Sequence, residues 1–495
     1  MSQNNLKEIK KIRLEKIDFL KRRSIQPYAY KYNVENSINE IKQNPEKYLE
    51  KTTSIAGRIV SLRKMGKSCF LNIQDMDNKI QVYIKDSNLK ADEYDNIVRK
   101  LDLGDIIGVK GVSFHTKTKE LSIKSISITL LSKNIYPLPN MKEKDGETFF
   151  SFEDKEHRYR KRYLDLIINN ENKLVFIKRS QIINNLRDFL NLNKYIEVET
   201  PILQPIYGGA NAKPFITYHN TLDEKLYLRI ADELYLKRLI IGGFNKVYEI
   251  SKNFRNEGMD RNHNPEFTML EFYSAFEDVY SMMKFTESLI QSVAKNINFR
   301  HDHIDFNKKF NQISFFESLD KFSLKKISAM DNSELLNLLK SNKIKVDKNS
   351  GRGKLLDKLF SHYVEPNLIA PTFVMDYPLE LSPLAKELRD NQQPGIVERF
   401  ELFIDGMEIA NAFSELNDPQ EQRFRLTEQS KLRDLGDEEA QVLDEDFLEA
   451  METGMPPTGG VGVGVDRLVM ILTNQKSIKD VILFPAMKNE KSKNS

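Results

Sequence analysis

Residues 247–275 decide the fold of this 495-residue chain. They read VYEISKNFRNEG at 247–258, HNP at 263–265 and EFTMLEFYSA at 266–275. The two runs that flank the loop alternate in polarity and predict β-strands over Val247–Arg255 and Glu266–Ala275. Every second side chain of a strand shares one face. One face of the first strand therefore carries Glu249, Asn253 and Arg255, and one face of the second carries Phe267, Met269, Glu271, Tyr273 and Ala275.

Together these faces offer a guanidinium, an aromatic ring, carboxylates and a phenol. Such a surface suits a ligand that contains a phosphate, a base and a cation, because Arg binds phosphate in a bidentate manner and aromatic rings stack on bases. The structural alternative is a salt-bridged sheet face that binds no ligand. The two strands alone leave both interpretations open.

Further strands and helices surround this pair. The sequence predicts strands over Glu398–Ile404 and Met407–Ala410, joined by a tight turn at Asp405-Gly406, and a helix over 173–195. Residues 314–360, rich in Leu, Lys and Ser, predict a helical insertion. The pattern indicates an α+β domain with an antiparallel sheet flanked by helices.

The N-terminal part of the chain has a different character. Apolar residues at helical spacing predict a helix over 6–23, which either packs on the next domain or lies on RNA. Five short β-rich runs follow between 54 and 131 and predict a small closed barrel of the oligonucleotide-binding (OB) type, with a small sandwich as the alternative. We expect a helical extension over 1–50, the five-stranded OB-type barrel over 51–140, a linker over 141–172, and a large catalytic domain over 173–495 with its helical insertion at about 300–375.

Charge is distributed unevenly along the chain. Residues 1–140 hold 26 Lys and Arg against 16 Asp and Glu, a net charge of +10, whereas residues 141–495 hold 49 against 56, a net charge of −7. The basic part suits contact with a polyanion, and a solvated Lys-rich surface is the alternative. No apolar run approaches the length of a membrane span, the N-terminus lacks a secretory h-region, and Cys69 is the single cysteine. We therefore expect a cytoplasmic protein without a membrane segment.

Three ordered motifs point to a family. TPIL at 200–203, the arginine-containing stretch at 247–275, and GGVGVGVDR at 459–467 resemble motifs one, two and three of class II aminoacyl-tRNA synthetases. LRIADELYLK (228–237), HNPEFTMLE (263–271), NAFSELND (411–418) and DVILFPAM (480–487) resemble the bacterial-type lysyl-tRNA synthetase family in particular. The resemblance covers nearly the whole chain. It implies that the protein uses ATP to activate L-lysine and transfers it to tRNA-Lys.

The resemblance also implies residues that bind ATP. Arg255 would contact both the lysine carboxylate and the α-phosphate, and Arg467 is the second catalytic arginine. Glu401 and Glu408 match the family's Mg²⁺-binding carboxylates, which suit a hard cation that bridges to phosphates. The full ATP-binding set implied by the resemblance is Arg255, Glu257, His263, Asn264, Phe267, Glu401, Glu408 and Arg467.

The implied amino-acid pocket is acidic. By the resemblance, Glu233 would bind the α-amino group of lysine, while Glu415 and Tyr273 would bind the side-chain ammonium. A buried ammonium needs an acidic partner, so such a pocket favours lysine over aspartate. The full lysine-binding set implied is Gly209, Glu233, Arg255, Glu271, Tyr273, Asn411 and Glu415, and the matching anticodon-binding residues on the barrel are Phe70, Gln81 and Glu120.

The expected chemistry requires no protein nucleophile. The lysine carboxylate attacks the α-phosphate and releases pyrophosphate, and a ribose hydroxyl of tRNA then attacks the adenylate, so catalysis rests on positioning and electrostatics. Rival interpretations are an aspartyl or asparaginyl synthetase, a paralogue that lysylates protein, and a non-catalytic RNA-binding regulator. Motif one lies at a dimer interface in the family, which implies a homodimer with Pro201 at the contact.

Overall fold

The computed structural model describes residues 3–76, 78–139, 141–144, 147–150, 152, 154–346, 351–389, 394–434 and 441–489. The chain forms two compact units, Met1–Asn172 and Lys173–Ser495. None of the helices in the described ranges combines the length and the apolar character that a membrane span requires.

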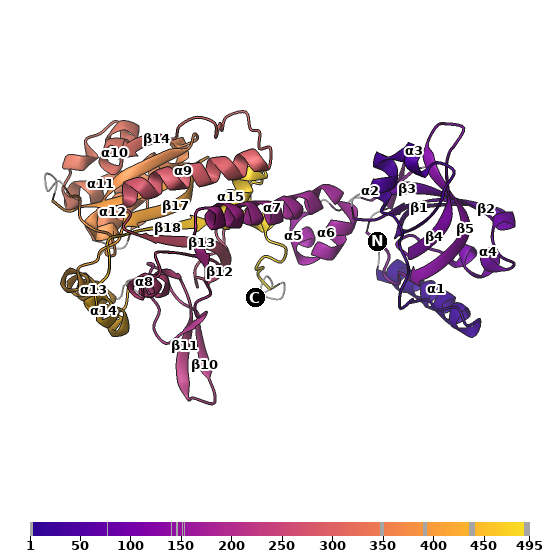
Figure 1. Cartoon of the computed structure of the whole chain (residues 1–495), viewed down its shortest axis with the longest axis horizontal. Helices are drawn as coiled ribbons and strands as arrows, with labels where there is room; N and C mark the ends of the chain where they lie inside the picture. The colour runs from indigo at the N-terminus through magenta and orange to yellow at the C-terminus, as the bar shows by residue number, and fades with distance from the viewer. Residues whose placement is uncertain are drawn as a thin grey trace. The chain divides into compact units, whose positions relative to one another are not determined.

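The first unit is a closed five-stranded β-barrel with the strand order β1-β2-β3-β5-β4 (Figure 1). Alternate residues of each strand point inward, so that Ile59, Leu71, Val82 and Val109 pack in one core. This confirms the predicted barrel, and the sandwich alternative is wrong. Its strands are β1 (Thr52–Met65), β2 (Ser68–Gln74), β3 (Lys79–Lys85), β4 (Ile106–His115) and β5 (Leu121–Ser132).

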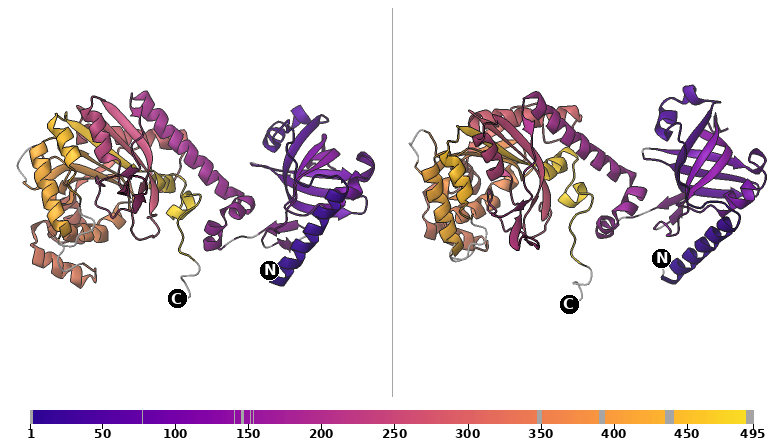
Figure 2. Two further views of the ribbon diagram at one scale, coloured as in Figure 1. Left: turned by 90° about the horizontal axis from the view of Figure 1, so that it is seen from below. Right: turned by 60° about the horizontal axis from the view of Figure 1, so that its bottom comes forward.

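The N-terminal helix α1 (Gln3–Arg22) lies against this barrel (Figure 2). Leu20 is fully buried in the barrel core, and the Lys16 ammonium lies 2.5 Å from the Asp102 carboxylate. The Arg13 guanidinium also donates to the Leu103 carbonyl at 3.2 Å. Of the two predicted roles, packing on the next domain is therefore observed.

The described residues of the predicted linker, 141–172, form several short elements. These are the strands β6 (Met141–Lys144) and β7 (Glu147–Phe150) and the helices α5 (Lys155–Arg160) and α6 (Arg162–Ile168). The buried Asp165 carboxylate accepts hydrogen bonds from Arg158 at 2.8 Å and Arg162 at 2.7 Å. The segment therefore has local structure of its own, and its role as a linker stays a prediction. In the sequence such a charged run resembles a loop. Its ion pairs become visible only in the folded structure.

The second unit is built on an eight-stranded sheet with the order β14-β15-β16-β17-β18-β13-β12-β8 (Figure 1). Its central strands are antiparallel, as predicted, whereas the edge pairs β14–β15 and β12–β8 are parallel. The strands are β8 (Ile196–Glu197), β12 (Lys246–Phe254), β13 (Glu266–Ala275), β14 (Asn311–Ser314), β15 (Thr372–Pro378), β16 (Ile396–Ile404), β17 (Met407–Ser414) and β18 (Thr458–Gly464).

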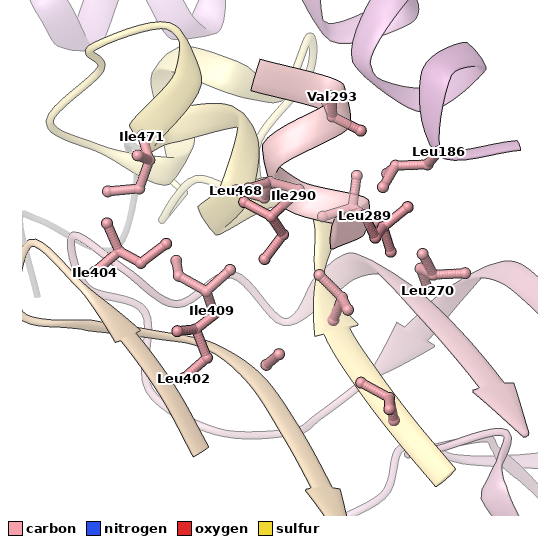
Figure 3. Packing of buried hydrophobic residues seen from close by; sticks show 14 of the residues in the cluster. Leu186, Leu270, Leu289, Ile290, Val293, Leu402, Ile404, Ile409, Leu468 and Ile471 are labelled. Atoms are coloured by element: carbon pink, nitrogen blue, oxygen red, sulfur yellow. The ribbon is translucent and has the colours of Figure 1, made fainter. Parts of the chain in front are cut away.

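Helices cover one face of the sheet, and the main hydrophobic core lies between these helices and the sheet. Leu289, Ile290 and Val293 of α9 (Val279–Asn296) pack with Leu468 of α15 (Val465–Leu472) above the sheet residues Leu270, Leu402 and Ile409 (Figure 3). Leu186 of α7 (Asn170–Leu192) joins the same cluster, so the predicted helix over 173–195 is confirmed with slightly shifted ends. The remaining helices of the unit are α8 (Glu233–Ile241), α10 (Phe315–Ser323), α11 (Asn332–Ser341), α12 (Arg352–Tyr363), α13 (Pro419–Asp434), α14 (Glu445–Glu452) and α16 (Ile478–Val481).

Two predicted boundaries need correction. Strand β17 continues past Ala410 to Ser414, because Asn411 and Ala412 pair with both β16 and β18. The insertion expected at about 300–375 is narrower, since it includes β14 and the start of β15, which belong to the main sheet. Its helical part consists of α10, α11 and α12, which pack in one core with residues of β15 and β16. The turn predicted at Asp405-Gly406 is present, with φ values of 52° and 71°.

We expect Leu289→Ala to destabilise the second unit. The Leu289 side chain is fully buried in the main core, and its removal leaves a cavity that costs about 2–5 kcal/mol of unfolding free energy. Denaturant unfolding followed by circular dichroism measures the loss. Leu324→Ala is the control, because Leu324 is 91% exposed and its truncation should leave the unfolding midpoint unchanged. Equal midpoints for both variants would contradict the assigned core.

Candidate active site

A cavity of about 380 Å³ opens on the face of the sheet formed by β13, β16, β17 and β18. Helix α8 and the loop between β12 and β13 complete its walls. Every site residue predicted for the catalytic domain lines this cavity. These are Gly209, Glu233, Arg255, Glu257, His263, Asn264, Phe267, Glu271, Tyr273, Glu401, Glu408, Asn411, Glu415 and Arg467.

Two arginines mark one end of the cavity. The Arg255 guanidinium lies 5.1 Å from the centroid of the Phe267 ring, and its Nε is buried without a hydrogen-bond partner among the described residues. Arg467 donates to the Glu408 carbonyl at 2.9 Å and lies 2.9 Å from the His263 Nε2 atom. Two cations beside an exposed ring face offer contacts for phosphates and for a stacked base.

The position of Arg467 depends on its neighbour Asp466, which the sequence analysis did not single out. The buried Asp466 carboxylate accepts a hydrogen bond from the Thr268 amide at 2.7 Å and pairs with Arg179 of α7 at 2.5 Å. It therefore joins β13 and α7 to the first turn of α15. This anchor holds Arg467 beside the loop that carries His263.

The loop between β12 and β13 is held by Asp260. Its carboxylate accepts hydrogen bonds from the amides of Asn262 at 2.7 Å and His263 at 2.8 Å, and it contacts the His263 Nδ1 atom at 2.8 Å. Partial burial acts to raise the pKa of Asp260, but these hydrogen bonds outweigh it and hold the pKa below its usual value. An ionised Asp260 thus orients the His263 ring toward Arg467.

Two carboxylates line the cavity where β16 and β17 meet. The Glu401 carboxylate accepts from Arg399 at 2.5 Å and from the Tyr377 hydroxyl at 2.8 Å, while Glu408 accepts from Arg467 at 3.2 Å. Burial raises the pKa of Glu401 to about 7 against the influence of Arg399, and the nearby Glu408 adds to the rise. Negative charge is therefore incompletely compensated at this point.

These two carboxylates suit a divalent cation that also contacts a bound phosphate. Mg²⁺ is commonly held by one or two carboxylates together with phosphates and water. Among the described residues no group of three or more His, Cys, Asp and Glu side chains is arranged to hold a metal. A cation at Glu401 and Glu408 would thus depend on a phosphate-bearing ligand for its remaining contacts.

The other end of the cavity is acidic and deeply buried. Glu233, Glu271 and Glu415 are 6%, 5% and 1% exposed, and the Tyr273 hydroxyl donates to Glu271 at 3.1 Å. Burial raises the pKa of Glu415 to about 8 even though the adjacent ammonium of Lys237 opposes the shift. Burial also raises the pKa of Glu271, with Asp232 and Glu233 as further causes. A ligand that brings positive charge would stabilise this end.

Sequence reasoning missed two cations beside this acidic end. Lys237 of α8 is fully buried and bridges Glu233 and Glu415. Arg399 of β16 lines the cavity and donates to the Asn411 side-chain oxygen at 2.9 Å. Lys237 ends the quoted motif LRIADELYLK, and its i, i+4 spacing from Glu233 on a helix was a further signal, but such spacing is equally common on exposed surfaces.

Two glycines leave space at the acidic end of the cavity that a side chain would fill. Gly209 adopts a φ of +85°, and a Cβ at this position would lie 3.0 Å from the Glu233 Cβ atom. A Cβ at Gly460 of β18 would lie less than 3.0 Å from the Glu415 Oε1 atom and from the Tyr273 ring. The glycines of motif three therefore let two ligand-facing side chains approach the sheet.

The predicted anticodon-binding residues lie together on the barrel. Phe70 of β2 and Tyr83 of β3 are cross-strand neighbours with ring centroids 4.7 Å apart. The Gln81 side chain donates to the Glu120 carboxylate at 3.2 Å and accepts from the Ser122 hydroxyl at 3.1 Å. A stacking ring beside polar groups is the usual arrangement for reading single-stranded RNA.

The architecture and the cavity define a class of enzyme. Residues 154–488 match the family described as tRNA synthetases class II (D, K and N), and residues 53–131 match the OB-fold nucleic acid binding domain. The first match covers well over half of the chain. It shows that the eight-stranded unit is the catalytic domain of a class II aminoacyl-tRNA synthetase.

Relatives narrow this class further. A protein named Lysine--tRNA ligase from Porphyromonas gingivalis is 48% identical over 98% of this chain and 86% of its own length. Lysine--tRNA ligases from Carboxydothermus hydrogenoformans and Christiangramia forsetii are each 47% identical, over 99% and 98% of this chain and over 99% and 87% of their own lengths. The chain therefore belongs to the lysine--tRNA ligase family.

Proposed function

We propose that this chain activates L-lysine with ATP to form lysyl-adenylate and transfers the lysyl group to the 3′ end of tRNA-Lys for translation in the cytoplasm. The carrying observation is the set of three buried carboxylates, Glu233, Glu271 and Glu415, at the closed end of the cavity. An amino acid whose side chain ends in an ammonium compensates this buried negative charge. Its carboxylate then points toward the arginine end.

In the activation step Arg255 is the central residue. Its guanidinium would bind the lysine carboxylate and the α-phosphate together, which neutralises two anions that otherwise repel each other. The adenine would stack between Phe267 and Arg467, with Glu257, His263 and Asn264 seating the rest of the nucleotide. Glu401 and Glu408 would hold Mg²⁺, which supplies positive charge beside the phosphates.

The acidic end sets the choice of amino acid. Glu233 would bind the α-amino group, with Gly209 and Asn411 completing its surroundings, and Glu415 and Tyr273 would bind the side-chain ammonium near Glu271. Aspartate would instead place a carboxylate among these acids. Lys237 gives that carboxylate no partner, since its ammonium is already shared by Glu233 and Glu415. The pocket therefore favours lysine over aspartate and asparagine.

The barrel would select the tRNA. Phe70 would stack on an anticodon base, and Gln81 and Glu120 would contact base edges. We therefore assign 51–140 to anticodon binding, 173–495 to catalysis, and 1–50 to a helical extension.

Charging of tRNA-Lys with radiolabelled lysine tests the complete reaction. We expect lysine to become acid-precipitable only when ATP and tRNA-Lys are both present, and tRNA-Asp to accept none. Phe70→Ala should weaken charging while leaving lysine activation intact, because Phe70 lies on the barrel. Charging of tRNA-Asp with aspartate, or of a protein with lysine, would refute the proposal.

A homodimer is part of the proposed function. Ile202 and Leu203 are 44% and 48% exposed, and Ile216 and Leu222 are each 60% exposed. The latter two lie on the hairpin of β10 (Ile216–His219) and β11 (Glu224–Leu228), which projects from the unit in Figure 1. Strand β11 pairs with β9 (Leu203–Gln204), so these side chains belong to one small sheet next to Pro201. Apolar surface of this kind typically marks an interface, here with a second copy of the chain.

Sedimentation equilibrium checks the dimer. Wild-type protein should associate in a concentration-dependent manner, and Ile216→Lys should raise the dimer dissociation constant by about tenfold or more, because it buries an unpaired ammonium. Leu324→Lys is the control, since it removes an equally apolar exposed side chain from α10's end and should leave association unchanged. A monomeric wild type, or two variants with equal association, would exclude this interface.

A further inference from the structure

Lys237 is the feature of the acidic end that the proposed reaction leaves unexplained. Its side chain is fully buried, and its ammonium lies 2.5 Å from the Glu233 Oε1 atom and also pairs with the Glu415 Oε2 atom. The Phe413 ring covers it from a further side, with its centroid 5.4 Å from the ammonium. The ammonium therefore occupies a fixed position behind the two carboxylates.

Each of the two carboxylates pairs with Lys237 through only one of its two oxygens. Glu233 meets it through Oε1, and Glu415 meets it through Oε2. The Glu415 Oε1 atom is buried and has no hydrogen-bond partner among the described residues. This atom lies against Gly460 and the Tyr273 ring, both of which line the cavity. One oxygen thus remains available to a second cation.

We infer that Lys237 is a positioning residue, a built-in counter-ion that shares Glu233 and Glu415 with the two ammonium groups of the substrate. The inference rests on the proposed lysine specificity and adds a residue to it. Lys237 holds the two carboxylates at a fixed separation before the amino acid arrives, and its positive charge keeps their pKa values lower than burial alone would set them. The substrate then binds the remaining oxygens without having to order the carboxylates first.

The surrounding charges make such a counter-ion necessary. Glu233 faces Lys237, Arg399 and Glu271, whereas Glu415 faces Lys237, Glu233 and the Tyr273 hydroxyl. Asp232 lies behind Glu271 and is compensated by Arg229. Without Lys237 the two carboxylates would repel each other in a buried place, and each would bind a proton more readily. A protonated carboxyl group is a poor partner for an ammonium.

The test is lysine-dependent ATP–pyrophosphate exchange by Lys237→Met at several pH values. Near pH 7 we expect the KM for lysine to rise by about tenfold or more, with little change in the KM for ATP. Toward about pH 9 the KM for lysine should approach the wild-type value, because the pKa values of Glu233 and Glu415 are raised further in the variant and deprotonation restores the binding form. A role in packing alone would give a rise that is equal at all pH values.

Controls separate the possible failures. Lys252→Met removes a lysine from β12 whose ion pair with Glu266, at 3.7 Å, is exposed, and it should behave as wild type. If Lys237→Met does not fold, Lys237→Gln retains hydrogen-bond donors without the charge and should show the same pH-dependent KM. A lysine KM within twofold of wild type, or a rise independent of pH, overturns the inference. Wild-type exchange that lysine does not stimulate would instead overturn the proposed function.

Discussion

Arg255→Ala should lower lysine-dependent ATP–pyrophosphate exchange by about 10³-fold, at the upper end of what the loss of a single transition-state contact costs. The charged groups that act on the buried Arg255 guanidinium are Glu257, Glu408, Arg467 and Glu271, and its Nε has no partner among the described residues. It is thus free to bind the two anions that react. Its loss removes charge stabilisation that develops as the carboxylate attacks the α-phosphate.

The loss should appear in kcat more than in the KM for lysine. The ammonium groups of the substrate would still be held by Glu233 and Glu415. Arg423→Ala is the matched control. The Arg423 guanidinium of α13 forms exposed ion pairs with Glu445 and Glu452 of α14, and Arg423 does not line the cavity. An Arg255→Ala enzyme within tenfold of wild type would remove Arg255 from the catalytic centre.

Gly460→Ala is expected to close the amino-acid pocket. The added methyl group would lie less than 3.0 Å from both the Glu415 Oε1 atom and the Tyr273 ring. Neither side chain has room to withdraw, because Glu415 and Tyr273 are both buried. Displacing them should cost about 3 kcal/mol, which corresponds to about a hundredfold higher KM for lysine. The KM for ATP should change little, since the proposed adenosine contacts, Phe267 and Arg467, lie at the other end of the cavity.

Two further glycines of β18, Gly462 and Gly464, serve as controls with progressively more space for an added methyl group. A Cβ at Gly462 would lie 3.2 Å from the Met269 methyl group, and a Cβ at Gly464 would lie 3.8 Å from the Arg467 Cδ atom. Gly462→Ala should therefore have a modest effect, and Gly464→Ala should be close to wild type in lysine binding. The KM for lysine should rise most in Gly460→Ala, less in Gly462→Ala and least in Gly464→Ala. Equal effects at all three positions would show that the alanines act on the strand rather than on the pocket.

The sequence predicted the parts of the fold that depend on local periodicity. The alternation of 247–255 and 266–275 was sufficient for β12 and β13, and the five β-rich runs were sufficient for the barrel. The helices within 141–172 were not predicted, because Arg158, Arg162 and Asp165 look like solvated charges in the sequence and their ion pairs are visible only in the fold. The length of β17 was underestimated because its later residues gain their partners from β16 and β18.

In the candidate site too, some residues were predicted from the sequence, whereas others became apparent only from the fold. Residues inside the family motifs, such as Arg255 and Glu415, were placed by resemblance, and the structure brings them to one cavity. Lys237 and Asp466 also lie inside quoted motifs, but no role was predicted for them, since their importance comes from burial and from partners far away in the chain. Charged residues are usually exposed, so a single sequence offers no reason to select these two.

The most direct test of the central claim is ATP–pyrophosphate exchange measured with each of the twenty amino acids in turn. We expect L-lysine alone to stimulate exchange strongly, because only it places an ammonium among Glu233, Glu271 and Glu415 while its carboxylate reaches Arg255. Stimulation by aspartate or asparagine would contradict the assignment of the acidic end. Exchange with none of the twenty would contradict catalysis itself and leave an RNA-binding protein with a synthetase fold.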